Sequence, residues 1–81
     1  MAEMRAKMAI IKIEKHSAEY ETLHLCAVAK DGPYPSDGSD EDNTYAKFSP
    51  AGSLQLSIAN PALIGKFSEG EKFYLDFTKA E

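Results

Sequence analysis

Apolar and polar residues alternate along three short stretches of the chain, and each stretch predicts a β-strand. Side chains two positions apart lie on the same face of a strand, so an alternating stretch has one apolar face and one polar face. The apolar positions are Leu23, Leu25 and Ala27 in 21–29, Leu54, Leu56 and Ile58 in 53–59, and Phe73, Leu75 and Phe77 in 72–78. We therefore expect Leu56 and Leu75, which lie mid-strand, to be core residues.

The run from residue 8 to residue 13 is also apolar, but its alternation slips. Met8 and Ile10 would lie on one face of a strand, and Ile11 and Ile13 on the other. Either a β-bulge near Ile10 and Ile11 turns these side chains inward, or both faces are covered. A second covered face requires another copy of the chain or a different protein. This run and the stretch 21–29 most simply pair as a hairpin.

Residues 31–43 separate the second strand from the rest of the chain. They contain two prolines, two glycines and five acidic residues, which leave little to pack. This composition predicts a mobile acidic loop. After the loop, residues 44–48 predict a short strand and residues 49–52 a turn. Asn60 and Pro61 are typical of a helix start, and Gly65 of its end.

The predicted order is therefore four strands, a short helix and a last strand, in one domain that covers residues 1–81. A mostly β chain of this kind predicts a small five-stranded β-barrel or sandwich with one short helix before the last strand. Phe48 and Phe77 would lie in its core. The candidate interface combines the slipped apolar run with two tyrosines expected to be exposed: Met8, Ile10, Ile11, Ile13, Tyr45 and Tyr74.

The net charge of −4 over 81 residues is unevenly distributed. Residues 31–42 carry five acids and no base, whereas residues 1–30 sum to +1 and residues 43–81 to zero. A nucleic-acid interface needs a basic face, so this distribution argues against one. Six aromatic residues could nevertheless form a stacking platform for single-stranded nucleic acid: Tyr20, Tyr34, Tyr45, Phe48, Tyr74 and Phe77.

The chain has two histidines and a single cysteine. His24 and Cys26 would share one face of a strand, where they could act as base and nucleophile or as two metal ligands. His16 is the second histidine, and a third partner and an oxyanion site have no visible candidate. We therefore interpret Cys26 as a small buried residue, and expect no catalytic residue, metal or cofactor.

Four clustered acidic residues suggest calcium, which prefers oxygen ligands. They are Asp37, Asp40, Glu41 and Asp42. Their spacing does not match a calcium-binding loop, so a solvated acidic loop is the preferred interpretation. The chain also contains no apolar run of about 18 residues, the length that would predict a membrane span. Its first 15 residues are interrupted by charges and do not predict a secretory signal.

Four stretches of the second half of the chain, 43–50, 54–58, 60–67 and 70–78, resemble a family of small uncharacterised proteins from tailed bacteriophages and prophages. A looser similarity extends to the first strand. The shared residues are strand, turn and cap residues, so the resemblance transfers no catalytic residue. It implies a phage setting close to virion structure, with expression in the cytoplasm of a host bacterium and the virion as a further location.

These observations favour a non-enzymatic phage or prophage protein that acts through protein–protein contacts, as a virion component or an assembly accessory. A protein partner or self-association is expected. The alternative is an oligonucleotide-binding small β-barrel, which the exposed tyrosines would serve. An enzyme is disfavoured because no constellation of acid, base and nucleophile is visible in the sequence.

Overall fold

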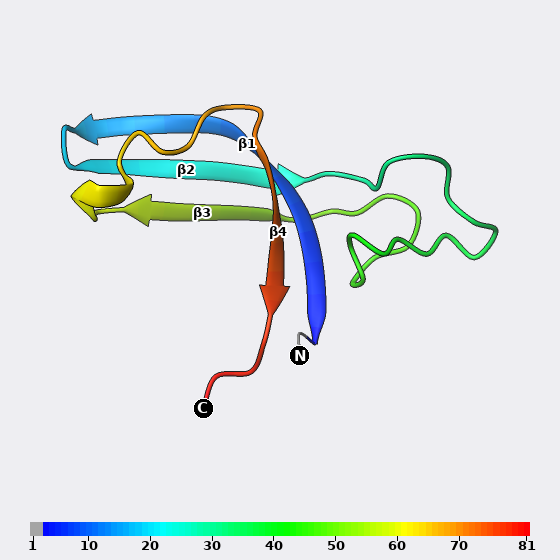
Figure 1. Cartoon of the computed structure of the whole chain (residues 1–81). Coiled ribbons are helices and arrows are strands. Elements are labelled where there is room, and N and C mark those ends of the chain that lie inside the picture. Colours follow the sequence, from blue (N-terminus) through cyan, green and yellow to red (C-terminus); the bar gives the residue numbers. More distant parts are fainter. Residues whose placement is uncertain (1–2) are drawn as a thin grey trace.

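The protein is an open antiparallel sheet in a computed structural model that describes residues 3–81 (Figure 1). Within these residues the sheet has four strands in the order β3-β2-β1-β4. They are β1 (Met4–Ser17), β2 (Tyr20–Ala27), β3 (Ser53–Ile58) and β4 (Lys72–Phe77). One turn of 3₁₀-helix, η1 (Pro61–Leu63), precedes β4. The mostly β class and the short helix before the last strand are confirmed, but the described residues form neither a fifth strand nor a closed barrel.

Strand β1 is shared by two halves of the sheet. Its second part pairs with β2, from Met8 opposite Ala27 to Ser17 opposite Tyr20, which confirms the predicted hairpin. Its first part, residues 4–9, pairs with β4. Strand β1 bends between the two parts, so that β4 crosses the direction of β2 and β3 (Figure 1).

A β-bulge lies where the alternation of the first apolar run slips. The register pairs Ile10 with Leu25, Lys12 with His24 and Ile13 with Leu23. Ile11 is therefore the extra residue on β1. The N–H of Ile10 donates to the carbonyl of Glu71 at 2.9 Å, which places the start of β4 beside the bulge. The bulge keeps Ile13 on the same face as Ile10, while Ile11 remains 57% exposed. The predicted bulge is thus present, but it turns three of the four side chains inward rather than all four.

The core lies on one face of the sheet. Its buried apolar side chains within the described chain are Ala6, Met8, Ile10, Leu23, Leu25 and Ile58, and partly buried ones pack against them: Ile13, Leu54, Ile64, Phe67 and Leu75. Leu75 therefore contributes to the core as expected. The expectation was wrong for Leu56, Phe77 and Phe48, which are 49%, 47% and 52% exposed. Alternation identifies the side chains that share a face, but it does not supply a second layer to cover that face.

The predicted strand at 44–48 is absent from the described fold because a polar contact takes its place beside β1. Beyond the end of β2, the N–H of Arg5 donates to Thr44 Oγ1 at 2.9 Å and the carbonyl of Arg5 accepts from the N–H of Thr44 at 3.0 Å. Two residues further, the N–H of Lys7 donates to Asn43 Oδ1 at 2.8 Å, and the carbonyl of Lys7 accepts from the N–H of Val28 at 2.9 Å. The edge of β1 is therefore satisfied without another strand.

Candidate functional site

An apolar groove of about 190 Å³ lies on the concave side of the bent sheet. The groove is lined by Ile10, Leu23, Leu25, Leu54, Leu56, Ile58, Phe67, Phe73, Tyr74 and Leu75. Strands β3 and β4 lie at opposite edges of the sheet, and the bend in β1 brings side chains from both strands into the same groove. Small-molecule sites usually include a few convergent polar side chains that orient the ligand, and this lining is almost wholly apolar. The groove is therefore suited to contact with another apolar surface.

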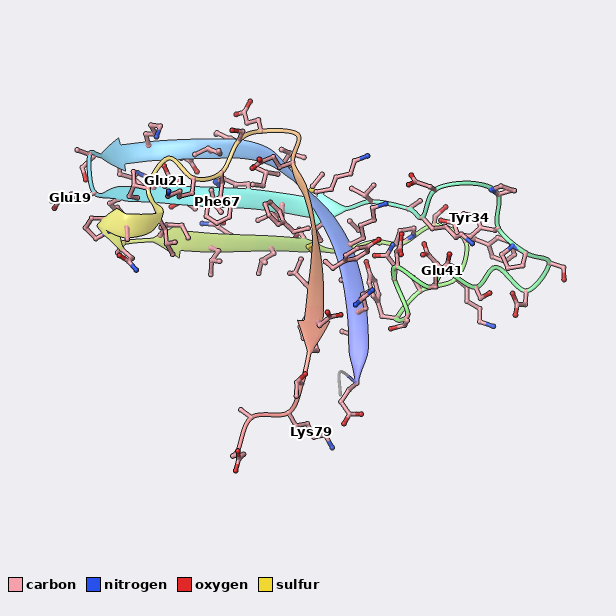
Figure 2. All side chains as sticks on the ribbon, viewed as in Figure 1. Glu19, Glu21, Tyr34, Glu41, Phe67 and Lys79 are labelled. Atoms are coloured by element: carbon pink, nitrogen blue, oxygen red, sulfur yellow. The ribbon has the colours of Figure 1, made fainter. Side chains whose placement is uncertain are left out.

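Polar side chains mark the limit of this apolar face near η1. Glu21 lies on the same face of β2 as Leu23, and it is 1% exposed (Figure 2). One carboxylate oxygen of Glu21 pairs with Lys15 Nζ at 3.1 Å. The other carboxylate oxygen of Glu21 is buried without a hydrogen-bond partner in the described chain, so this ion pair, which joins β1 to β2 near the end of the hairpin, satisfies the carboxylate only in part.

The structure divides the candidate interface of the sequence analysis. Met8 and Ile10 are buried within the monomer at 7% and 1% exposure, and Ile10 forms part of the floor of the groove. Ile11 is exposed outside the groove, and Tyr45 and Tyr74 are 37% and 53% exposed. Of these, Tyr74 lines the groove. Leu56 and Phe73, which are also partly exposed in the groove, were placed on the inward face instead, because a small barrel or sandwich was expected.

Tyr74 packs against a neutralised cation rather than a basic patch. The guanidinium carbon of Arg5 lies 4.6 Å from the centre of the Tyr74 ring. Arg5 also pairs with Asp76, with 2.7 Å between Nε and Oδ1. Nearby on β1, Lys7 Nζ lies 3.5 Å from a carboxylate oxygen of Asp42. Acids thus accompany the cations at this end of the sheet.

The two histidines lie on the polar face of the sheet and are engaged with its neighbouring strands. His24 pairs with Glu14 on β1. The hydrogen bond from His24, together with the charge of Lys12, lowers the pKa of the Glu14 carboxyl. His16 Nε2 lies 2.9 Å from Thr22 Oγ1. The histidine contacts thus join β1 to β2 and do not involve Cys26, and residues 3–81 contain no group of three or more side chains placed to hold a metal ion.

The acidic loop is anchored to the sheet by two buried polar side chains. Asp40 and Asn43 are 3% and 0% exposed. Asp40 accepts hydrogen bonds from the backbone N–H groups of Lys30, Asp42 and Asn43. Asn43 donates to the carbonyl of Val28 at 2.8 Å and to Asp40 Oδ2 at 3.2 Å. The expectation that this loop has little to pack was therefore wrong for these residues, while its mobility stays a prediction.

The other acids proposed for calcium also have partners of their own. Asp37 accepts from the N–H of Ser39 at 3.0 Å, and Glu41 pairs with Lys30 at 3.0 Å. Gly38 has a φ of +74°, and a Cβ there would lie 2.3 Å from a ring carbon of Phe48. The loop is thus shaped by local contacts rather than by oxygen atoms converging on one point.

The buried contacts of Asp40 predict a loss of stability in acid. Burial alone would raise the pKa of Asp40, but hydrogen bonds from Asn43 and the backbone outweigh burial and lower it. Ionised Asp40 stabilises the fold fully above about pH 3.9, the ordinary pKa of an aspartate in an unfolded chain. This stabilisation is lost as the pH falls through the lower pKa that Asp40 has in the folded protein. Urea denaturation between about pH 6 and pH 2.5 should show stability falling below about pH 4.

Two variants assign this loss to Asp40. In Asp40→Asn, the fall in stability over the same pH range should be shallower than in the wild type. Asp31→Asn, which changes a carboxylate whose side chain is 96% exposed, should leave the slope unchanged. Equal slopes in all three proteins would contradict the assignment.

Comparisons with protein-family models, with curated proteins and with solved structures found no match to this chain. Residues 3–81 contain no helix that is long and apolar enough to cross a membrane.

Proposed function

We propose that this chain is a non-enzymatic phage or prophage protein that acts through protein–protein contacts, as a virion component or an assembly accessory. The observation that carries the proposal is the apolar groove on the concave face of the sheet. Apolar side chains at its rim, including Leu56 and Phe73, remain 49% and 36% exposed. Contiguous exposed apolar surface of this kind commonly marks a protein interface.

The chemistry of the groove supports binding over catalysis. Hydrophobic and aromatic side chains provide contact area, but they cannot transfer protons or stabilise a developing charge. The polar face carries Glu14 and His24, whose ion pair joins two strands. Asp40 and Asn43, the buried polar side chains of the loop, are used to hold backbone groups.

The phage setting rests on the resemblance of the second half of the chain to small tailed-phage proteins. The stretches that carry it include β3, η1 and β4. Two of these elements, β3 and β4, supply the walls of the groove. A role in virion structure or assembly is a setting in which such a surface would be covered by protein.

Oligonucleotide binding, the alternative function, receives less support from the charges. The cation beside Tyr74 is Arg5, and Asp76 neutralises it. The five acids of residues 31–42 would repel a phosphate backbone. The open sheet also differs from the closed barrel on which the alternative was based.

The proposal is tested by following the chain through phage assembly. A tagged copy is expressed from its own locus, and a lysate from infected or induced cells is fractionated by sedimentation. Mass spectrometry should find the chain in virions or in assembly intermediates. Recovery solely in the slow-sedimenting fraction would contradict the proposal. Salt-dependent binding of single-stranded DNA by the purified protein would instead favour the alternative.

A further inference from the structure

We infer that the concave apolar face is covered in solution by the same face of a second copy of this chain. This inference deepens the proposed function, on which it rests, by naming the first protein partner of the groove. The two sheets would close face to face about a two-fold axis. Each copy would supply half of a barrel-like sandwich.

The chain exposes more surface than a compact monomer of its mass, and the excess is close to the area that each copy buries in a dimer. The chain exposes 5553 Å². A compact folded monomer of 8.9 kDa is expected to expose about 4800 Å². The excess of about 750 Å², to which the loop between β2 and β3 also contributes, approaches the roughly 800 Å² that each partner buries in a standard protein interface.

The shape of the molecule also indicates a missing layer. Its extents are 47 × 32 × 16 Å and its radius of gyration is 14.5 Å. A compact chain of this length has a radius of gyration of about 12 Å. The loop between β2 and β3 extends beyond one end of the sheet and contributes to the length (Figure 1). The short 16 Å dimension, however, belongs to a sheet without a second sheet about 10 Å away.

Cover from within the described chain is incomplete. The segment between β3 and β4 places Ile64 against the core, together with Phe67, which is labelled in Figure 2. Leu56 on β3 and Phe73 on β4 remain partly exposed at the two sides of the groove. A stable sheet buries its apolar face against another layer, so the cover is needed whenever the chain is folded.

A second copy meets this need better than an unrelated protein does. It is present wherever the chain is made, and a two-fold dimer is the commonest symmetric assembly. The charge distribution permits the contact. Residues 31–42 carry −5, and the remainder of the chain sums to +1. Since the acidic loop projects from one end of the sheet, the apolar faces can meet without bringing like charges together (Figure 1).

Light scattering coupled to size-exclusion chromatography tests the inference on the purified chain at about 50 µM, because dimerisation depends on protomer concentration. The wild type should have about twice the monomer mass of 8.9 kDa. Leu56→Asp should halve the measured mass. Leu56 is half-exposed in the monomer, so the aspartate can reach water there, and far-ultraviolet circular dichroism should show a folded sheet.

Ile11→Asp is the matched control. Ile11 is 57% exposed but lies outside the groove, so this variant should keep the dimer mass. A second measurement does not depend on a variant that folds. Isotope-filtered NMR on a mixture of labelled and unlabelled wild-type chains should detect contacts between the Leu56 methyl groups and an aromatic ring of the other copy.

Two results would overturn the inference. One is a monomeric wild type at this concentration, including a monomer that uses Leu56 to bind a different phage protein. The other is a dimer that Ile11→Asp dissociates and Leu56→Asp does not. The failure of the proposed function is a separate result: a dimer that never sediments with virions or assembly intermediates contradicts that function and leaves the dimer standing.

Discussion

Replacing Asn43 with alanine is expected to lower the free energy of unfolding by about 2–4 kcal/mol. The side chain of Asn43 is fully buried and accepts a hydrogen bond from the N–H of Lys7. It also donates to the carbonyl of Val28 and to Asp40. Alanine would leave these groups buried without their partner, and the loop would lose its buried side-chain contacts with Lys7 on β1 and with Val28 at the end of β2.

Asn60→Ala provides the control of the same residue type. Asn60 is exposed, and its side chain accepts one hydrogen bond, from the N–H of Ala62 at 3.0 Å. The loss of such a cap costs about 1 kcal/mol or less in a short helical turn. Urea denaturation of both variants measures the difference. Similar midpoints would show that the buried network around Asn43 does not hold the loop.

Ile10→Ala is expected to cost about 2–5 kcal/mol of stability, because it removes a buried side chain and leaves a cavity. Ile10 is 1% exposed and packs on the core face of β1. The neighbouring substitution Ile11→Ala should cost about 0.5 kcal/mol or less, since Ile11 is the exposed residue of the bulge.

The pair of variants tests which of the two neighbouring side chains faces the core. Both are compared with the wild type by urea denaturation at one fixed protein concentration. A large cost for Ile11→Ala, or a small one for Ile10→Ala, would contradict the observed burial of Ile10 and exposure of Ile11.

The local sequence pattern was sufficient to predict the regular strands and the turn and cap residues between them. The strands at 53–58 and 72–77 follow the alternation of apolar residues, and Asn60 with Pro61 marks the 3₁₀ turn. The slip around Ile10 and Ile11 was correctly associated with a bulge. Each of these features is decided within a few residues, where period and turn chemistry act.

The path of residues 43–48 could not be predicted because distant contacts decide it. The pattern there permits a strand, but Asn43 and Thr44 satisfy backbone groups of β1 about 40 residues earlier. Phe48 then adopts a positive φ of 62°, which ends any extended conformation. An asparagine such as Asn43 predicts a loop whether its side chain is solvated or buried, so the sequence alone does not reveal the buried contacts.

The groove was missed for a different physical reason. Alternation placed Leu54, Leu56 and Leu75 on one face, and the structure keeps them there. Whether that face is covered depends on the number of strands and on the curvature of the sheet, which local patterns do not encode. With four strands in the described chain instead of five, the residues assigned to a closed core instead line an open groove.

The division of β1 between two partners has a consequence for the order of folding. The β1–β2 hairpin joins residues that are close in sequence, since Ser17 pairs with Tyr20. Pairing β1 with β4 instead joins Arg5 to Asp76, which closes a long loop at a greater entropic cost. The hairpin should therefore form first and β4 should dock last. We therefore expect β4 to detach from β1 more readily than β2 does, and local unfolding to begin at this edge of the sheet.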